Sequence, residues 1–165
     1  MEMLEVLIMN EHVPFADKVR EDLVLLNVEG ETRDEVLYNI AKVIMDKGIA
    51  KPTFYDALLE RENAYPTGLP IGEINIAIPH TYPEHINEVA ITIAIPKKPV
   101  VFYNMGARDE EVLVSVIVCL TMRKMDDNVK LLPALMSFFA DEGNLRRLLK
   151  CTTPAEVMAL VTAEN

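Results

Sequence analysis

The sequence has few cysteines, no tryptophan and no long hydrophobic run, and these absences exclude whole classes of protein. Its two cysteines, Cys119 and Cys151, cannot form the disulfide framework of a small secreted domain. Cys119 lies in the apolar run 114–120, where we expect a buried free thiol. No stretch approaches the roughly 20 apolar residues of a membrane span. The first residues carry Glu2 and Glu5 without the basic segment of a signal peptide. We therefore expect a cytoplasmic protein with no membrane insertion.

Basic residues are also scarce, because 16 Lys and Arg stand against 26 Asp and Glu, for a formal net charge of -10. A field of this sign repels phosphate backbones, so we expect no nucleic-acid partner. The acidity either attracts a basic protein partner or only keeps the chain soluble. The composition, 50% hydrophobic and 25% charged, is typical of a globular domain, and we predict a single domain over residues 1–165.

Helical and strand patterns are mixed along the chain. Apolar runs and alternating apolar residues predict strands at 23–28, 74–78, 89–95 and 112–120. Helical spacing predicts helices at about 32–47 and 52–61, and through the C-terminal third. The second and third strands lie too close in sequence for a helical crossover, which leaves an antiparallel or irregular pairing between them. We therefore predict an α/β fold, a mixed β-sheet sandwiched by α-helices, with strand 112–120 at its centre.

Two of these helices have sequence signals at their ends. Thr32 with Glu35, and Thr153 with Glu156, form capping boxes in which the hydroxyl and the carboxylate accept bonds from free backbone amides. Gly48 is placed to stop the first of these helices in a left-handed conformation.

His80 is the strongest candidate for chemistry. It follows the strand 74–78 directly after Pro79, at the end of a strand, where an α/β sheet presents reactive groups to a crevice. A neutral imidazole is nucleophilic near pH 7 and can accept a phosphoryl or acyl group without an auxiliary base. The same position also suits a loop histidine that only makes hydrogen bonds.

His85 lies five residues further on, after Glu84. Two imidazoles and a carboxylate could begin a zinc site, but a closed site needs four ligands and the sequence offers no convincing others, so we predict no metal. A metal-dependent hydrolase using His80 and His85 would require stoichiometric bound metal. Otherwise His85 either donates a hydrogen bond to an anion held at His80 or is a solvated loop residue.

Arg61 falls on the inward stripe of the second predicted helix, together with Phe54, Ala57 and Leu58. Because burial of an unpaired cation is costly, this arginine pairs with a carboxylate, extends to water, or binds an anion. The next loop leads to the strand that bears His80, so the two side chains can converge as phosphoryl transfer requires. The sequence has no glycine-rich phosphate loop and no G-x-S-x-G elbow, and we expect no cofactor.

Several segments form one ordered pattern: R-E at 61–62, Y-P-T-G-L at 65–69, N-I-A-I-P-H at 75–80, K-P-V at 98–100, V-K-L-L at 129–132 and T-T-P at 152–154. From about residue 20 onward, this pattern resembles the phosphotransferase-system enzyme IIA domain (EIIA type 2) of the fructose/mannitol superfamily. The resemblance implies the mannitol-type enzyme IIA fold. It also implies a phosphotransferase activity.

The resemblance assigns roles to two residues. His80 matches the histidine that takes a phosphoryl group from the phosphohistidine of the carrier protein HPr. That histidine passes the group to a cysteine of enzyme IIB, for use by a membrane enzyme IIC that imports and phosphorylates a sugar. Arg61 matches the arginine that steadies the phosphoryl group. Neither cysteine here resembles the enzyme IIB acceptor, so we expect that partner to be a separate polypeptide.

One position departs from the mannitol-type pattern, because Asn128 stands where those members carry a second active-site histidine. The departure leaves His85 as the spare imidazole near His80. A histidine at this spacing, together with residues 65–68, resembles galactitol-type members, and we predict galactitol or a related polyol as the sugar. The alternative is a regulatory module whose phosphorylation state another protein reads, as in nitrogen-type relatives.

Overall fold

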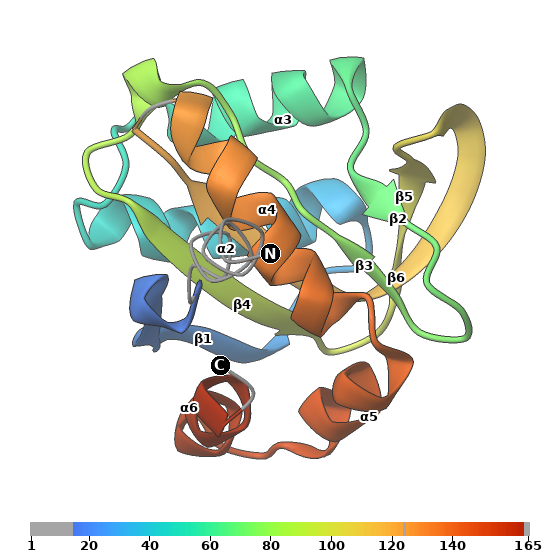
Figure 1. Cartoon of the computed structure of the whole chain (residues 1–165). Helices are drawn as coiled ribbons and strands as arrows, with labels where there is room; N and C mark the ends of the chain where they lie inside the picture. Colours follow the sequence, from blue (N-terminus) through green and yellow to red (C-terminus); the bar gives the residue numbers. More distant parts are fainter. Residues whose placement is uncertain (1–14, 124, 164–165) are drawn as a thin grey trace, which may run out of the picture.

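The computed structural model of the chain describes residues 15–123 and 125–163, except for the side chains of 125–130. Its elements, drawn in Figure 1, are η1 (Phe15–Lys18), β1 (Val19–Val28), α2 (Arg33–Asp46), α3 (Phe54–Ala64), β2 (Gly68–Leu69), β3 (Asn75–Ala77), η2 (Pro83–His85), β4 (Ala90–Pro96), β5 (Val100–Asn104), β6 (Ala107–Thr121), α4 (Met125–Phe139), α5 (Glu142–Lys150) and α6 (Pro154–Ala163). Within these described ranges, no helix has the length and apolar character needed to cross a membrane.

The strands form one mixed six-stranded sheet in the order β1-β4-β6-β3-β2-β5. β1 pairs parallel with β4 and β3 pairs parallel with β6, whereas β4 and β6 are antiparallel. The predicted mixed sheet with a central β6 is confirmed. The predicted direct pairing of β3 with β4 is wrong, because β6 lies between them. β6 is buried on both faces along its second half, so it takes the centre and separates the two strands that are close in sequence.

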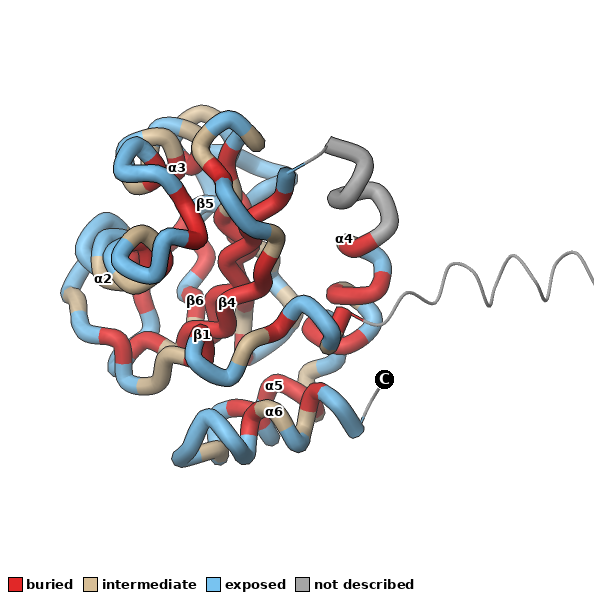
Figure 2. Tube along the Cα trace, turned by 90° about the vertical axis from the view of Figure 1, so that its left-hand side faces the viewer, coloured by how far each residue is buried: buried red, intermediate tan, exposed pale blue. Residues whose placement is uncertain are grey.

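Helices cover both faces of this sheet, as predicted. Figure 2 shows the buried strands in the middle, with α2 and α3 on one side and α4 on the other. Alternate residues of β4 enter opposite cores: Ile91 and Ile93 pack with α4, α5 and α6, whereas Ala90 and Ala94 pack with α2 and α3. The sheet thus has a helical layer on each face. Arg61 belongs to α3, in the layer that also contains α2.

Both predicted capping boxes form, but each glutamate binds the amide of the residue before the cap and not that of the cap itself. The Thr32 hydroxyl accepts a bond from the Glu35 amide at 3.2 Å, and the Thr153 hydroxyl accepts one from the Glu156 amide at 3.2 Å. Both helices therefore begin where the sequence predicts.

The helix predicted at 52–61 is displaced toward its C-terminus, since α3 runs from Phe54 to Ala64. The Lys51 amide donates to the carbonyl of His85 at 2.9 Å, and Ala50 pairs with Ile86 in an isolated bridge. These long-range bonds hold Ala50 and Lys51 outside the helix. A turn at Pro52 and Thr53 follows, and the helix begins after it.

β6 is longer than the predicted strand 112–120, because its first residues pair with β5 while remaining exposed. β5 also pairs with β2, so β6, β3, β2 and β5 form a closed circuit of strands. The circuit requires glycine at position 68, where a Cβ would lie 2.5 Å from the carbonyl oxygen of Tyr103. The close approach of the Gly68 and Tyr103 backbones holds the loop between α3 and β3 against the hairpin of β5 and β6.

Candidate active site

His80 lies just beyond β3, where a parallel bridge to Leu120 joins it to β6. Its Nδ1 lies 2.8 Å from the carbonyl oxygen of Ile78. A carbonyl only accepts, so Nδ1 carries the proton and Nε2 keeps its lone pair when the ring is neutral. Burial lowers the pKa of His80 below its ordinary value, and the positive charge of Arg61 lowers it further, against the opposing effect of the Ile78 bond. The imidazole is thus held neutral, with one nitrogen free to form a bond.

Arg61 projects from α3 and is half-buried between two aromatic rings. Its guanidinium carbon lies 4.2 Å from the centre of the Tyr65 ring and 5.4 Å from that of Tyr82. In the part of the chain that the structure describes, no carboxylate forms an ion pair with Arg61. The first of the three explanations offered for this residue is therefore not observed. Stacking on the two rings orients the cation without neutralising it.

His85 ends η2 and is turned toward α3. Its Nδ1 lies 2.8 Å from the hydroxyl of Thr53, and its Nε2 lies 3.7 Å from a carboxylate oxygen of Glu84. It lines a hollow of about 340 Å³ together with residues of α3 and of the loop after His80. The lining of this hollow includes Arg61, Tyr65, Thr81, Tyr82, Glu84 and His85. The structure thus brings Arg61 and His85 onto one hollow. His80 does not line this hollow itself, and the chain reaches it at the next residue, Thr81.

Glu62 supports the candidate site from the position next to Arg61, and sequence reasoning missed this role. Its side chain is buried, and its carboxylate accepts bonds from the amide and the hydroxyl of Thr67, each at 2.7 Å. Burial raises the pKa of Glu62, although the bonds from Thr67 oppose this shift. The contact ties the end of α3 to the loop that carries Tyr65. A charged residue next to Arg61 in the 61–69 pattern was the available signal, but its burial follows from packing.

The remaining candidates make no further site. Cys119 is buried as predicted, and burial raises its pKa to about 12, so its thiol is inert. Among the described residues, no group of three or more His, Cys, Asp or Glu side chains is arranged to hold a metal ion. The side chain of Asn128 lies outside the described residues.

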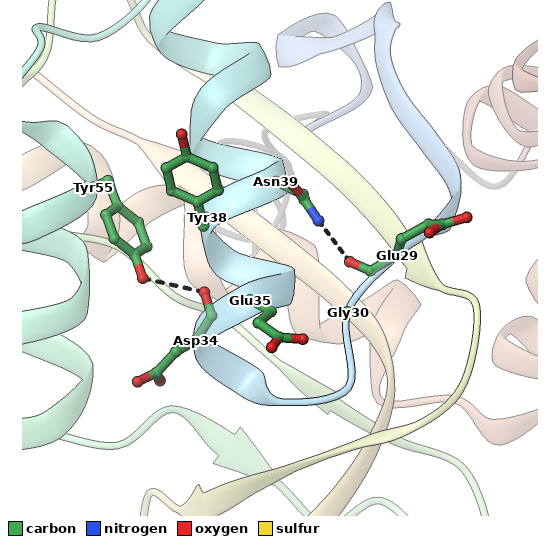
Figure 3. A pocket seen from close by; sticks show the side chains of 7 residues that line it. All are labelled: Glu29, Gly30, Asp34, Glu35, Tyr38, Asn39 and Tyr55. Atoms are coloured by element: carbon green, nitrogen blue, oxygen red, sulfur yellow. Dashed lines mark hydrogen bonds between the residues drawn. The ribbon is translucent and has the colours of Figure 1, made fainter.

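A separate hollow of about 480 Å³ lies beside the start of α2, and Figure 3 shows its lining. Tyr55 donates its hydroxyl proton to the Asp34 carbonyl at 3.2 Å, and Asn39 binds the Glu29 carbonyl at 2.8 Å. Three carboxylates surround this hollow, on Glu29, Asp34 and Glu35. Their negative charge opposes a phosphoryl group, and no cation is among the residues that line this hollow. The hollow at Arg61 is the better anion site, because its lining sets a cation beside the carboxylates of Glu60 and Glu84.

Residues 18–164 match the family described as phosphoenolpyruvate-dependent sugar phosphotransferase system, EIIA 2. The chain belongs to this family. The resemblance drawn from the ordered sequence pattern is therefore confirmed, and the protein is an EIIA component of a sugar phosphotransferase system.

Two of the known proteins that are similar in sequence to this chain come from Escherichia coli K12. The galactitol-specific EIIA component is 34% identical over 103 residues, which cover 62% of this chain and 68% of that protein. The ascorbate-specific EIIA component is 26% identical over 157 residues, which cover 90% of this chain and 97% of that protein.

Solved structures confirm the predicted mannitol-type EIIA fold. The crystal structure of the mannitol IIA of Escherichia coli matches with a TM-score of 0.73 at 21% identity, covering 87% of this chain and 99% of that one. The complex of enzyme IIAMtl with phosphorylated enzyme IIBMtl of Escherichia coli matches with a TM-score of 0.73 at 20% identity, covering 88% and 98%.

Proposed function

We propose that this EIIA component is a phosphoryl carrier that accepts the group from phospho-HPr on Nε2 of His80. The observation that carries the proposal is the 2.8 Å bond from Nδ1 to the Ile78 carbonyl. This bond orients the ring and leaves Nε2 as the nucleophile. Burial and the charge of Arg61 keep the ring neutral by lowering its pKa, so the lone pair is present near pH 7.

The transfer can be written as a balanced step. Nε2 attacks the phosphorus, and a new N–P bond forms as the N–P bond of the donor breaks. The electron pair of the broken bond returns to the donor nitrogen, and the positive charge gained by His80 is stabilised through Nδ1–H and the Ile78 carbonyl. When a cysteine thiolate of enzyme IIB then attacks, the N–P electron pair returns to Nε2 and the neutral ring is restored.

Arg61 would stabilise the charge on the phosphoryl oxygens. Its positive charge acts on His80, and it lines the hollow that Thr81, the residue after His80, also lines. The rings of Tyr65 and Tyr82 orient its guanidinium group. Positioned positive charge is the main requirement of phosphoryl transfer, because the protein does little other chemistry there. His85, fixed by Thr53, would donate a further hydrogen bond to the bound anion.

For the sugar and partners, we propose a polyol of the galactitol type and a separate enzyme IIB working in the cytoplasm with a membrane enzyme IIC. The galactitol-specific relative supports this sugar. The ascorbate-specific relative, which aligns over more of the chain, supports ascorbate as the competing substrate. The complex of a similarly folded IIA with phosphorylated IIB supports the choice of acceptor.

The test is to incubate the chain with phosphoenolpyruvate, enzyme I and HPr and to map the phosphorylated residue by mass spectrometry. We expect one phosphoryl group on His80 and none in folded His80→Ala, with His85→Ala as the matched control that is still labelled. Enzyme IIB from the galactitol and the ascorbate systems is then offered as acceptor, and the faster acceptor identifies the sugar class. Labelling elsewhere than His80 contradicts the carrier proposal, and failure of both acceptors favours the regulatory role.

A further inference from the structure

Two buried hydroxyls, those of Thr81 and Thr92, have no hydrogen-bond partner in the part of the chain that the structure describes. The two residues are 7% and 1% exposed, and each hydroxyl oxygen exposes less than 1 Å². A buried hydroxyl without a partner has lost its bonds to water and gained none in return, which disfavours the folded state. Each such group therefore requires an explanation.

The two hydroxyls occupy different places in the fold. Thr92 lies in the middle of β4 opposite Cys119 of β6, inside the sheet. Thr81 directly follows His80 and lines the hollow that Arg61 and His85 also line. Only the second of these positions is next to a candidate anion site.

We propose that the hydroxyl of Thr81 binds the phosphoryl group carried by His80, donating a hydrogen bond to one of its oxygens. This inference rests on the proposed carrier function. Rotation about the Cα–Cβ bond moves the hydroxyl between staggered positions, and in the phosphorylated protein it turns toward the hollow. Arg61 supplies the charge from α3, and Thr81 supplies a donor from the residue that follows His80. The unpaired hydroxyl of the free protein then gains its partner only when the phosphoryl group is present.

This arrangement favours acceptance of the group, because a bond that is absent before transfer and present after it stabilises only the later states. A hydrogen bond to a charged oxygen is stronger than one between neutral groups. Loss of such a bond corresponds to a change of about 10- to 100-fold in an equilibrium or rate. Thr81 would therefore act on phosphoryl affinity without forming any covalent bond itself.

The experiment compares Thr81→Val, which keeps the shape and removes the hydroxyl, with Thr81→Ser, which keeps the hydroxyl. Thr92→Val is the matched control, because it removes the other unpartnered hydroxyl away from the hollow. Each protein is phosphorylated by phospho-HPr and, separately, by phosphoramidate, which needs no protein docking. The single-turnover rate and the half-life of phospho-His80 are measured, together with the melting temperature of the unphosphorylated protein.

We expect Thr81→Val to accept the group about 10- to 100-fold more slowly from both donors, without any loss of melting temperature. Thr81→Ser and Thr92→Val should transfer at rates close to that of the wild type. Thr81→Ala replaces the valine variant if that variant does not fold. The inference is overturned if folded Thr81→Val transfers at the wild-type rate, or if Thr81→Ser loses as much rate as Thr81→Val. In either case the carrier function still stands, provided that wild-type His80 is labelled. A wild type that is not labelled on His80 overturns both.

Discussion

The carboxylate of Glu62 is bound twice by Thr67, once through the backbone amide and once through the hydroxyl, with both distances at 2.7 Å. Glu62 belongs to the last turn of α3, and Thr67 precedes β2. The pair therefore joins the helix that carries Arg61 to the loop that carries Tyr65. Because Arg61 stacks on Tyr65, this buried contact fixes the positions of two residues of the candidate anion site.

The first prediction concerns the pH dependence of stability. Burial raises the folded-state pKa of Glu62 above its unfolded value of about 4.3. The folded state then holds the proton more tightly, so this contribution is present below about pH 4 and is lost as the pH rises through the folded-state pKa. Glu62→Gln lacks this titration. Urea titration measures the free energy of unfolding of the wild type and of Glu62→Gln at each pH. The wild-type value, relative to that of Glu62→Gln, should fall as the pH rises above about 4, and a constant difference would contradict the prediction.

The second prediction concerns the pH dependence of phosphoryl acceptance. His80 reacts through its neutral form, and its pKa lies below the ordinary value near 6.5. The single-turnover rate from phosphoramidate should therefore stay constant from about pH 8 to about pH 6.5 and decline only below that range. Arg61→Ala removes a charge that disfavours the imidazolium, so the His80 pKa, followed by NMR, should rise in this variant. A His80 pKa above the ordinary value in the wild type would contradict the assignment.

The third prediction separates catalysis by Arg61 from a structural role. Arg61→Ala should slow transfer by orders of magnitude, since loss of an arginine that stabilises a transferring phosphoryl group costs about 10³–10⁵ elsewhere. Stability should fall by no more than about 1 kcal/mol per lost ring contact, because no ion pair with a described carboxylate is broken. Arg61→Lys should restore the rate only in part, because a point charge replaces a planar fork. A large drop in melting temperature with a normal transfer rate would indicate a structural residue.

The fourth prediction concerns His85 and the residue that orients it. His85→Ala should slow transfer without abolishing it, because His85 does not form the bond to phosphorus. Thr53→Ala removes the hydroxyl that lies 2.8 Å from His85 Nδ1, and it should reproduce part of this loss. The Thr53 side chain makes no capping bond to α3, so the helix should remain intact by circular dichroism. Complete loss of labelling in folded His85→Ala would mean that the ranking of the two histidines is wrong.

Features that depend on residues close together in the chain could be predicted from the sequence. The capping boxes at Thr32 and Thr153 form because hydroxyl and amide are three residues apart, a distance that the helix geometry supplies. The apolar run 112–120 predicted the central strand because burial on both faces requires continuous hydrophobicity. His80 and Arg61 were selected as candidates in the same way, from the end of a strand and from the inward stripe of a helix.

Tertiary structure alone decided which distant groups meet. β6 separates β3 from β4, and no local pattern reveals this, because pairing is chosen among strands with similar apolar faces by the packing of the whole sheet. Packing also buried Glu62 against Thr67 and placed Arg61 on two rings in place of a carboxylate. The unpartnered hydroxyl of Thr81 belongs to the same class, because a side chain's burial and its missing partners depend on every element that surrounds it.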